Sequence, residues 1–264
     1  MSALYYEVSG HGPDVVLLHG WSLNLRVWDG LVRALAPRFR LIAIDLPGHG
    51  HSDWDPRAAT PAAQAWRIHE TVAPLSERYT LLGWSLGGQL ALDLAAALPA
   101  GVERLVLIGT TPRFLIGPNW RCGTPRPLLA RLAHRLHSEG ERAVFDFLTQ
   151  LSRGSAPHTA ARVLSKLRRA LTTHGAARPE ALMSGLARLR DGDLRRALPL
   201  VRVPALVMAG QRDRIIRPAA SRALARALPR ARYVELEGAA HAPFLSHPVQ
   251  FTRQLTGFLS EGAP

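Results

Sequence analysis

A serine between glycines is the first feature of this sequence that could carry chemistry. Residues 83–88 read GWSLGG, which places Ser85 in a G-x-S-x-G motif. An apolar run of strand length, residues 79–82, precedes the motif, and an Ala- and Leu-rich helical pattern, residues 86–98, follows it. A serine in this context lies on a tight strand-to-helix turn that exposes its hydroxyl, and the glycines avoid collisions with neighbouring backbone. We therefore predict that Ser85 is a nucleophile.

A serine hydroxyl is a weak nucleophile at neutral pH and needs a general base that a carboxylate orients. Where such a motif links a strand to a helix, the chain order is serine, acid, histidine, with each residue after a strand end. Asp213 follows the apolar run 205–208, and His241 follows the run 233–236. We predict His241 as the base and Asp213 as its orienting acid. The alternative carboxylates are Asp191 and Asp193.

Two backbone N–H groups are needed to stabilise the oxyanion that forms during acyl transfer. The residue after the nucleophile, Leu86, supplies one. The loop after the early apolar run 15–18 supplies the other, and the N–H of Trp21 is its natural donor. We interpret His19 as a structural residue that braces this loop through hydrogen bonds.

The turn at residues 45–52 contains two histidines, His49 and His51, and is expected to buttress the site. We predict no metal site there, because neither a carboxylate nor a cysteine completes a ligand set. Cys122 is the only cysteine, which excludes an internal disulfide and a cysteine-based metal cluster. The chemistry outlined above requires no metal and no organic cofactor.

The elements that must position these residues alternate along the chain. Apolar runs of strand length lie at residues 15–18, 41–44, 79–82, 102–108, 205–208 and 233–236. Helical patterns lie at residues 27–35, 61–72, 86–98, 219–228 and 248–259. This alternation predicts the α/β class, with a mostly parallel central sheet and helices on both of its faces. From about residue 112 to 200 the pattern is helical only, at 128–136, 143–151 and 160–171, which predicts an inserted helical lid.

Length and composition fit a single domain over residues 1–264, since 47% of the residues are hydrophobic and the mean hydropathy is near zero. No apolar run approaches the ~18 residues that a membrane span needs. The start of the chain lacks the features of a secretion signal. We therefore expect a soluble, cytoplasmic protein that does not bind membranes, and we expect it to be a monomer.

The formal net charge is +13, and nearly all of the positive charge is arginine. Residues 113–190 hold fourteen basic and only four acidic side chains, so much of the excess lies in the predicted insertion. Either the base composition of the genome or an acidic partner explains this charge. A nucleic-acid partner is not expected, because no basic motif with interleaved aromatic residues is present.

Taken together, the segments 19–21, 45–52, 83–88 and 241–243, with Asp213, resemble the α/β-hydrolase superfamily over essentially the whole chain. A narrower resemblance rests on HGWSLN at 19–24, GWSLGG at 83–88 and AAHAPF at 239–244. These segments are similar to those of the pimeloyl-[acyl-carrier protein] methyl ester esterases of biotin biosynthesis. The resemblance implies a serine carboxylesterase that hydrolyses the methyl ester of a pimeloyl chain carried on acyl carrier protein, giving methanol.

The resemblance also implies roles for further residues. Contacts with the substrate would come from Trp21, Ser85, Leu86, Phe147, Leu148, Thr149, Gln150, Leu151 and His241. Contacts with the acidic carrier protein would come from Arg142, Arg162, Lys166 and Arg169. Two simpler interpretations stay open: Phe147 as an ordinary core aromatic residue of the insertion, and the basic residues as a solvated helix face.

The same triad would serve other hydrolases. A general short-chain carboxylesterase, a carbon-carbon bond hydrolase and a cofactor-free haloperoxidase are the alternatives that the motifs leave open. A dehalogenase or an epoxide hydrolase would carry an aspartate where Ser85 stands. A non-enzymatic interaction protein on the same fold would be expected to have lost a triad residue, and none is missing in this sequence.

Overall fold

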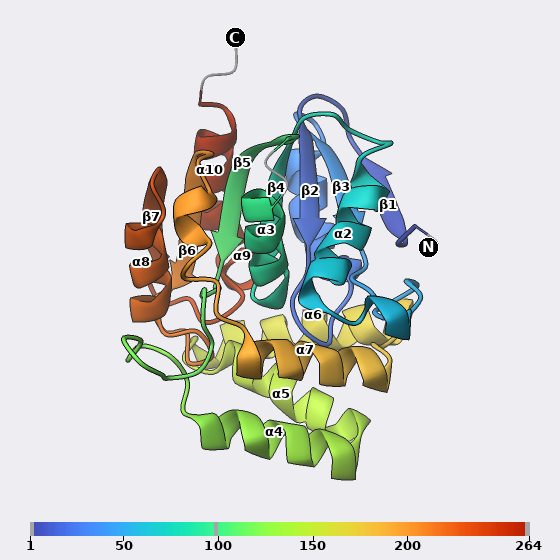
Figure 1. Ribbon diagram of the computed structural model, residues 1–264, viewed down its shortest axis with the longest axis vertical. Helices are drawn as coiled ribbons and strands as arrows, with labels where there is room; N and C mark the ends of the chain where they lie inside the picture. The colour runs from blue at the N-terminus through green and yellow to red at the C-terminus, as the bar shows by residue number, and fades with distance from the viewer. Residues whose placement is uncertain (1–2, 98–99, 262–264) are drawn as a thin grey trace.

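A seven-stranded sheet forms the centre of the fold (Figure 1). The computed structural model describes residues 3–97 and 100–261. The strands are β1 (Tyr6–Ser9), β2 (Asp14–Leu18), β3 (Arg40–Ile44), β4 (Tyr79–Trp84), β5 (Val102–Ile108), β6 (Ala205–Gly210) and β7 (Ala231–Leu236). Their order is β1-β3-β2-β4-β5-β6-β7, with β1 antiparallel to β3 and every other neighbouring pair parallel. This arrangement confirms the predicted α/β class.

Side-chain alternation along the strands divides the core into two layers. Val15 and Leu17 of β2 belong to one buried cluster, and Val16 and Leu18 belong to the other. This division follows from the two-residue period of a strand, which sends successive side chains to opposite faces. Helices α1 (Asp29–Leu35) and α10 (Pro248–Leu259) cover the first face, and α2 (Pro61–Val72), α3 (Leu86–Ala97) and α8 (Pro218–Ala227) cover the second.

Two short elements differ from the predictions. The edge strand β1 was not predicted, because three of its four residues are only partly buried and the fourth is exposed, so it lacks a continuous apolar run. The helix expected at 27–35 begins as a 3-10 turn, η1 (Leu25–Trp28), before α1. Asn24 caps this turn, because its side chain accepts a hydrogen bond from the N–H of Arg26.

Four helices lie between β5 and β6 and form a helical insertion. They are α4 (Arg126–Glu139), α5 (Glu141–Ser152), α6 (Pro157–His174) and α7 (Pro179–Asp191). Figure 1 shows them as a layer across the carboxyl ends of the parallel strands. Ligands of open α/β sheets bind at that end of the strands. The insertion therefore covers the place where a site is expected.

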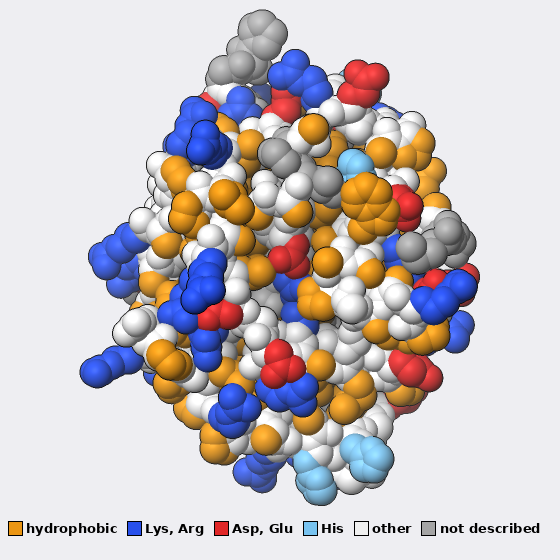
Figure 2. Space-filling view, viewed as in Figure 1, with side chains coloured by type: hydrophobic (Ala, Val, Ile, Leu, Met, Phe, Trp, Pro, Cys, Tyr) orange, Lys and Arg blue, Asp and Glu red, His pale blue; other side chains and the backbone are white. Residues whose placement is uncertain are grey.

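Positive charge is spread widely over the surface. On the face shown in Figure 2, Lys and Arg side chains lie over both the sheet layer and the insertion, and fewer Asp and Glu side chains lie among them. Within the described residues, none of the helices has the length and apolar character needed to cross a membrane.

Candidate active site

Ser85 occupies the sharp turn between β4 and α3. Its backbone has φ of 54°, a left-handed conformation that is strained for a non-glycine residue. The turn depends on its glycines: a Cβ on Gly87 would lie 2.4 Å from the backbone oxygen of His19. Two contacts with β5 and the residues after it help to hold the strained residue: its N–H donates to the Ile108 carbonyl at 2.9 Å, and its carbonyl accepts the Thr110 hydroxyl at 2.7 Å.

His241 and Asp213 form a buried pair after the ends of β7 and β6. Nδ1 of His241 lies 2.7 Å from Oδ2 of Asp213, and the two residues are only 1% and 4% exposed. The other carboxylate oxygen, Oδ1, accepts the N–H groups of Ile215 at 2.8 Å and Ile216 at 2.9 Å. Since the carboxylate can only accept, Nδ1 carries the proton and Nε2 remains free to act as a base.

Backbone contacts fix the position of the His241 ring relative to Ser85. The Trp84 indole donates to the His241 carbonyl at 2.9 Å, and the His241 N–H donates to the Leu151 carbonyl at 3.1 Å. A Cβ on Gly109 would lie 3.2 Å from Nδ1 of His241. Gly109 directly follows Ile108, whose carbonyl binds the Ser85 N–H. The structure thus brings Ser85 and His241 to the same end of β5.

The alternative carboxylates have other partners. Asp193 binds Arg113 and Arg195, whose guanidinium groups hold the pKa of that carboxyl far below its usual range. Asp191 binds the neighbouring Arg190 at 2.7 Å and is exposed. Of the three carboxylates weighed from the sequence, Asp213 is the one that contacts His241.

The predicted oxyanion donors, Leu86 and Trp21, lie in different elements. Leu86 is the first residue of α3, so its N–H has no acceptor inside the helix. For Trp21 the direction of the N–H follows from the neighbouring carbonyl, because C=O and N–H point in opposite directions across a trans peptide. The carbonyl of Gly20 lies 2.9 Å from Nδ1 of His19.

The hydrogen bonds of His19 define its tautomer. Its Nε2 accepts the N–H of Leu46 at 2.9 Å, so the ring proton is on Nδ1 and is donated to the Gly20 carbonyl. Burial lowers the pKa of His19 well below its usual value, so the ring is neutral. His19 therefore fixes the peptide plane that carries the Trp21 N–H, a structural role that matches the sequence interpretation.

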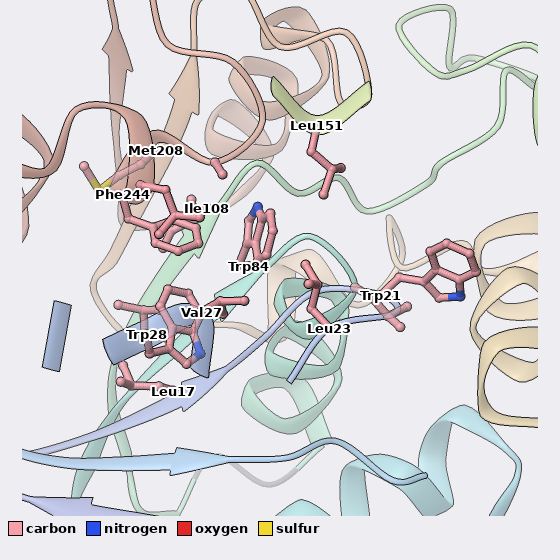
Figure 3. Close-up of a cluster of buried hydrophobic side chains, with 14 of the residues drawn as sticks. Leu17, Trp21, Leu23, Val27, Trp28, Trp84, Ile108, Leu151, Met208 and Phe244 are labelled. Atoms are coloured by element: carbon pink, nitrogen blue, oxygen red, sulfur yellow. The ribbon is translucent and has the colours of Figure 1, made fainter. Parts of the chain in front are cut away.

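The Trp21 side chain extends from this loop into the insertion. Its indole N–H donates to the Leu182 carbonyl of α7 at 2.9 Å, and its ring meets Phe147 of α5 edge-on at 4.9 Å. Gly185 makes room for the ring, because a Cβ there would lie 2.5 Å from Cδ1 of Trp21. Figure 3 shows Trp21 pointing away from the cluster around Trp28.

The predicted substrate segment of α5 is divided between a cleft and the core. Phe147 and Gln150 line a cleft of about 510 Å³ whose wall also includes Ile215, two residues after Asp213. Leu148 and Leu151 are buried in the hydrophobic core. The Thr149 hydroxyl donates to a carbonyl of its own helix. Phe147 and Gln150 are thus the members of this segment that line the cleft.

The four predicted carrier-contact residues are exposed but do not form one group. Lys166 and Arg169 of α6 line a groove of about 860 Å³ between α1, α6 and α10, together with Arg33 and Arg253. Arg162 lies on the same helix, one turn before Lys166, and donates to the Ser246 carbonyl. Arg142, at the start of α5, does not line this groove.

Sequence reasoning assigned no chemical role to three further buried residues. Asn24, Asp45 and His174 connect the loop of Trp21 to the end of α6 through hydrogen bonds. Asn24 and Asp45 lie in motifs that the sequence made visible, whereas His174 carries no signal, because its burial depends on distant segments. In the part of the chain that the structure describes, no cluster of His, Cys, Asp or Glu side chains is suited to hold a metal ion.

Comparisons with known proteins agree with this geometry. The profile of the alpha/beta hydrolase family matches residues 15–254. The pimeloyl-[acyl-carrier protein] methyl ester esterase of Xanthomonas oryzae pv. oryzae (strain MAFF 311018) is 41% identical over 257 residues, covering 97% of this chain and 99% of that protein. The protein of the same name from Nitrosomonas europaea is 39% identical over 252 residues, covering 95% of this chain and 97% of that protein.

A solved structure of an esterase from Exiguobacterium antarcticum superposes with a TM-score of 0.88 at 25% identity, covering 98% of this chain and 96% of that one. The chain therefore belongs to the alpha/beta hydrolase family and, within it, to the family of the pimeloyl-[acyl-carrier protein] methyl ester esterases. The fold and family expected from the sequence motifs are confirmed.

Proposed function

We propose that this protein is a serine carboxylesterase that hydrolyses the methyl ester of pimeloyl-[acyl-carrier protein] to the free acid and methanol. The observation that carries the reaction type is the buried 2.7 Å pair of His241 and Asp213 beside the strained turn of Ser85. The substrate class is supported by relatives of that name, which match nearly the whole chain.

The reaction proceeds in two acyl-transfer steps. Ser85 Oγ attacks the ester carbonyl while Nε2 of His241 takes its proton. The carbonyl oxygen becomes an oxyanion that accepts the N–H groups of Trp21 and Leu86, and each donor contributes roughly 3 kcal/mol in the transition state. Methanol then leaves with the proton from His241. Water, deprotonated by His241, attacks the acyl-enzyme, and collapse of the second tetrahedral intermediate returns the proton to Ser85.

The insertion acts as a lid that shapes the substrate path. Trp21 and Phe147 meet edge-on where the loop after β2 contacts α5, and Phe147 lines the cleft whose wall includes Ile215, close to Asp213. An aliphatic chain gains roughly 0.8 kcal/mol for each CH₂ that it buries against such a surface. These contacts favour an extended acyl chain bound between α5 and the loop that follows β6.

The carrier protein docks on the basic face of α6. Among the described residues, Arg162, Lys166 and Arg169 form no ion pair with a carboxylate. Partial burial and the neighbouring cations Arg162 and Arg33 lower the pKa of Lys166, a sign that positive charge is concentrated there. An uncompensated basic surface favours association with an acidic partner.

The test compares hydrolysis of pimeloyl-[acyl-carrier protein] methyl ester, free dimethyl pimelate and p-nitrophenyl acetate by the wild type and by Ser85→Ala. We expect a strong preference for the carrier-linked ester and complete loss of turnover in Ser85→Ala. Cleavage of the small esters alone would overturn both the proposed substrate and the proposed docking of the carrier protein on α6. Activity retained in Ser85→Ala would overturn the reaction mechanism.

A further inference from the structure

We infer that Asn24 is a positioning residue, which couples helix α6 of the insertion to the loop that carries the Trp21 N–H. We call residues 20–25 the oxyanion loop. Asn24 is fully buried, and its Nδ2 donates to the carbonyls of Ala170 and Gly175, each at 2.9 Å. Its Oδ1 accepts the N–H of Arg26 at 3.1 Å. Both amide protons thus bind the carboxyl end of α6, while the oxygen caps η1, the turn that begins at the last residue of the oxyanion loop.

A second connection runs through the next residue of the loop. The N–H of Leu25 donates to Oδ1 of Asp45 at 2.8 Å, and Oδ2 of Asp45 lies 2.8 Å from Nε2 of His174, the last residue of α6. Asp45 and His174 are 0% and 3% exposed. Two successive loop residues are therefore attached to the same helix end inside the protein.

The remaining hydrogen bonds of the oxyanion loop explain why this attachment matters. The Gly20 carbonyl, which sets the direction of the Trp21 N–H, receives the His19 ring proton at 2.9 Å and a long contact of 3.4 Å from the Leu23 N–H. Ser22 has φ of 66°, which is strained for serine. His19 holds one end of this strained turn, and Asn24 holds the other.

Asn24 also supplies a hydrogen-bond partner where α6 ends. Gly175 directly follows the helix, so its carbonyl lies outside the helical hydrogen-bond pattern, and Nδ2 of Asn24 donates to it. A side chain that keeps the cap at Arg26 but cannot reach α6 would detach the oxyanion loop from the helix, and the Trp21 N–H would then be held in its direction less firmly. The inference rests on the proposed function, because it assumes that this N–H stabilises the oxyanion.

Another hydrogen bond between the insertion and the core offers a matched control. In this second contact the side-chain amide belongs to Gln64 of α2, and its Nε2 donates to the Ser184 hydroxyl of α7 at 2.9 Å. The same hydroxyl donates to the Ala59 carbonyl at 3.2 Å. This contact attaches the insertion to the core without touching the oxyanion loop, so Ser184→Ala should weaken attachment alone.

The experiment measures p-nitrophenyl acetate hydrolysis by the wild type, Asn24→Ser, Asn24→Asp and Ser184→Ala. Serine and aspartate still cap the turn at Arg26 but cannot donate to α6 as the amide does. We expect kcat to fall about tenfold to thirtyfold in both Asn24 variants, less than the 10²–10³-fold loss of an oxyanion donor. KM should stay within about twofold, and affinity for a trifluoromethyl ketone inhibitor should fall by the same factor as kcat/KM.

Ser184→Ala should keep kcat within about twofold of the wild type even where its melting temperature falls. A wild-type kcat in folded Asn24 variants, or an equal loss in Ser184→Ala, would overturn the inference. If the Asn24 variants do not fold, His174→Asn tests the second connection, with an expected fall in kcat of about threefold to tenfold; an unchanged kcat there would also overturn it. Activity that survives Ser85→Ala would instead refute the proposed function itself.

Discussion

Replacing Asp213 by asparagine should disable the proposed base while leaving the site intact in shape. Oδ1 of Asp213 accepts two backbone N–H groups, from Ile215 and Ile216, so the amide oxygen of the asparagine must take that position. The NH₂ group then faces Nδ1 of His241, where Oδ2 lies 2.7 Å away in the wild type. Because NH₂ can only donate, Nδ1 must become the acceptor and Nε2 must carry the proton.

A protonated Nε2 cannot take the proton of Ser85. The same change in a serine protease triad lowers kcat by about 10⁴, equivalent to about 5.5 kcal/mol of activation free energy. We expect a loss of that size here, with KM for p-nitrophenyl acetate little changed. The unfolding free energy should fall by only about 1–3 kcal/mol, since one buried charged hydrogen bond is exchanged for a neutral one.

The assay is steady-state hydrolysis of p-nitrophenyl acetate, with protein folding checked by circular dichroism. Asp193→Asn and Asp191→Asn are the matched controls, because both carboxylates bind arginines rather than His241. Both controls should keep kcat within about twofold of the wild type. A folded Asp213→Asn variant with kcat within tenfold of the wild type would refute the reasoning, as would a large loss in either control.

Three further predictions concern packing and charge. Gly185→Ala places a Cβ 2.5 Å from the Trp21 ring, so overpacking should lower the unfolding free energy by about 1–3 kcal/mol and should lower kcat/KM for the carrier-linked ester. An unchanged unfolding free energy in denaturant titration, together with an unchanged kcat/KM, would contradict this prediction. Burial lowers the pKa of His49 from 6.5 to about 4. Between pH 4 and pH 6.5 the unfolded chain therefore binds a proton on His49 that the folded chain does not bind. Stability should therefore fall by up to about 3 kcal/mol as pH decreases through that window, and His49→Asn should flatten the profile in urea titrations. Arg188 pairs with Asp93 at 2.6 Å, and the side chains are 5% and 19% exposed. Arg188→Met leaves the Asp93 charge without its partner and should lower the unfolding free energy by about 3–5 kcal/mol, measured by thermal unfolding. Adding Asp93→Asn to the same chain should recover part of that loss.

Much of the fold and of the candidate active site could be predicted from local sequence. The five inner strands are largely buried on both faces and therefore read as nearly continuous apolar runs, whereas β1, half-exposed at one edge, does not. The other edge strand, β7, was predicted from residues 233–236, although Leu236 is the only one of its residues that is buried. Ser85 was predictable because its turn needs glycines at fixed offsets between a strand and a helix. His241 was predictable because it follows the last strand, and the chain order of the triad then required a carboxylate before it.

Only the tertiary structure decided which side chains meet. Proximity in sequence does not distinguish Asp213 from Asp193, because the choice depends on which loop faces the His241 ring. The amide of Asn24 reaches a helix carbonyl 146 residues away. Local patterns encode strands and helices because backbone hydrogen bonding and burial repeat over a few residues. The partners of a buried polar group come from whichever distant segments the packed core brings beside it, and that placement belongs to the whole chain.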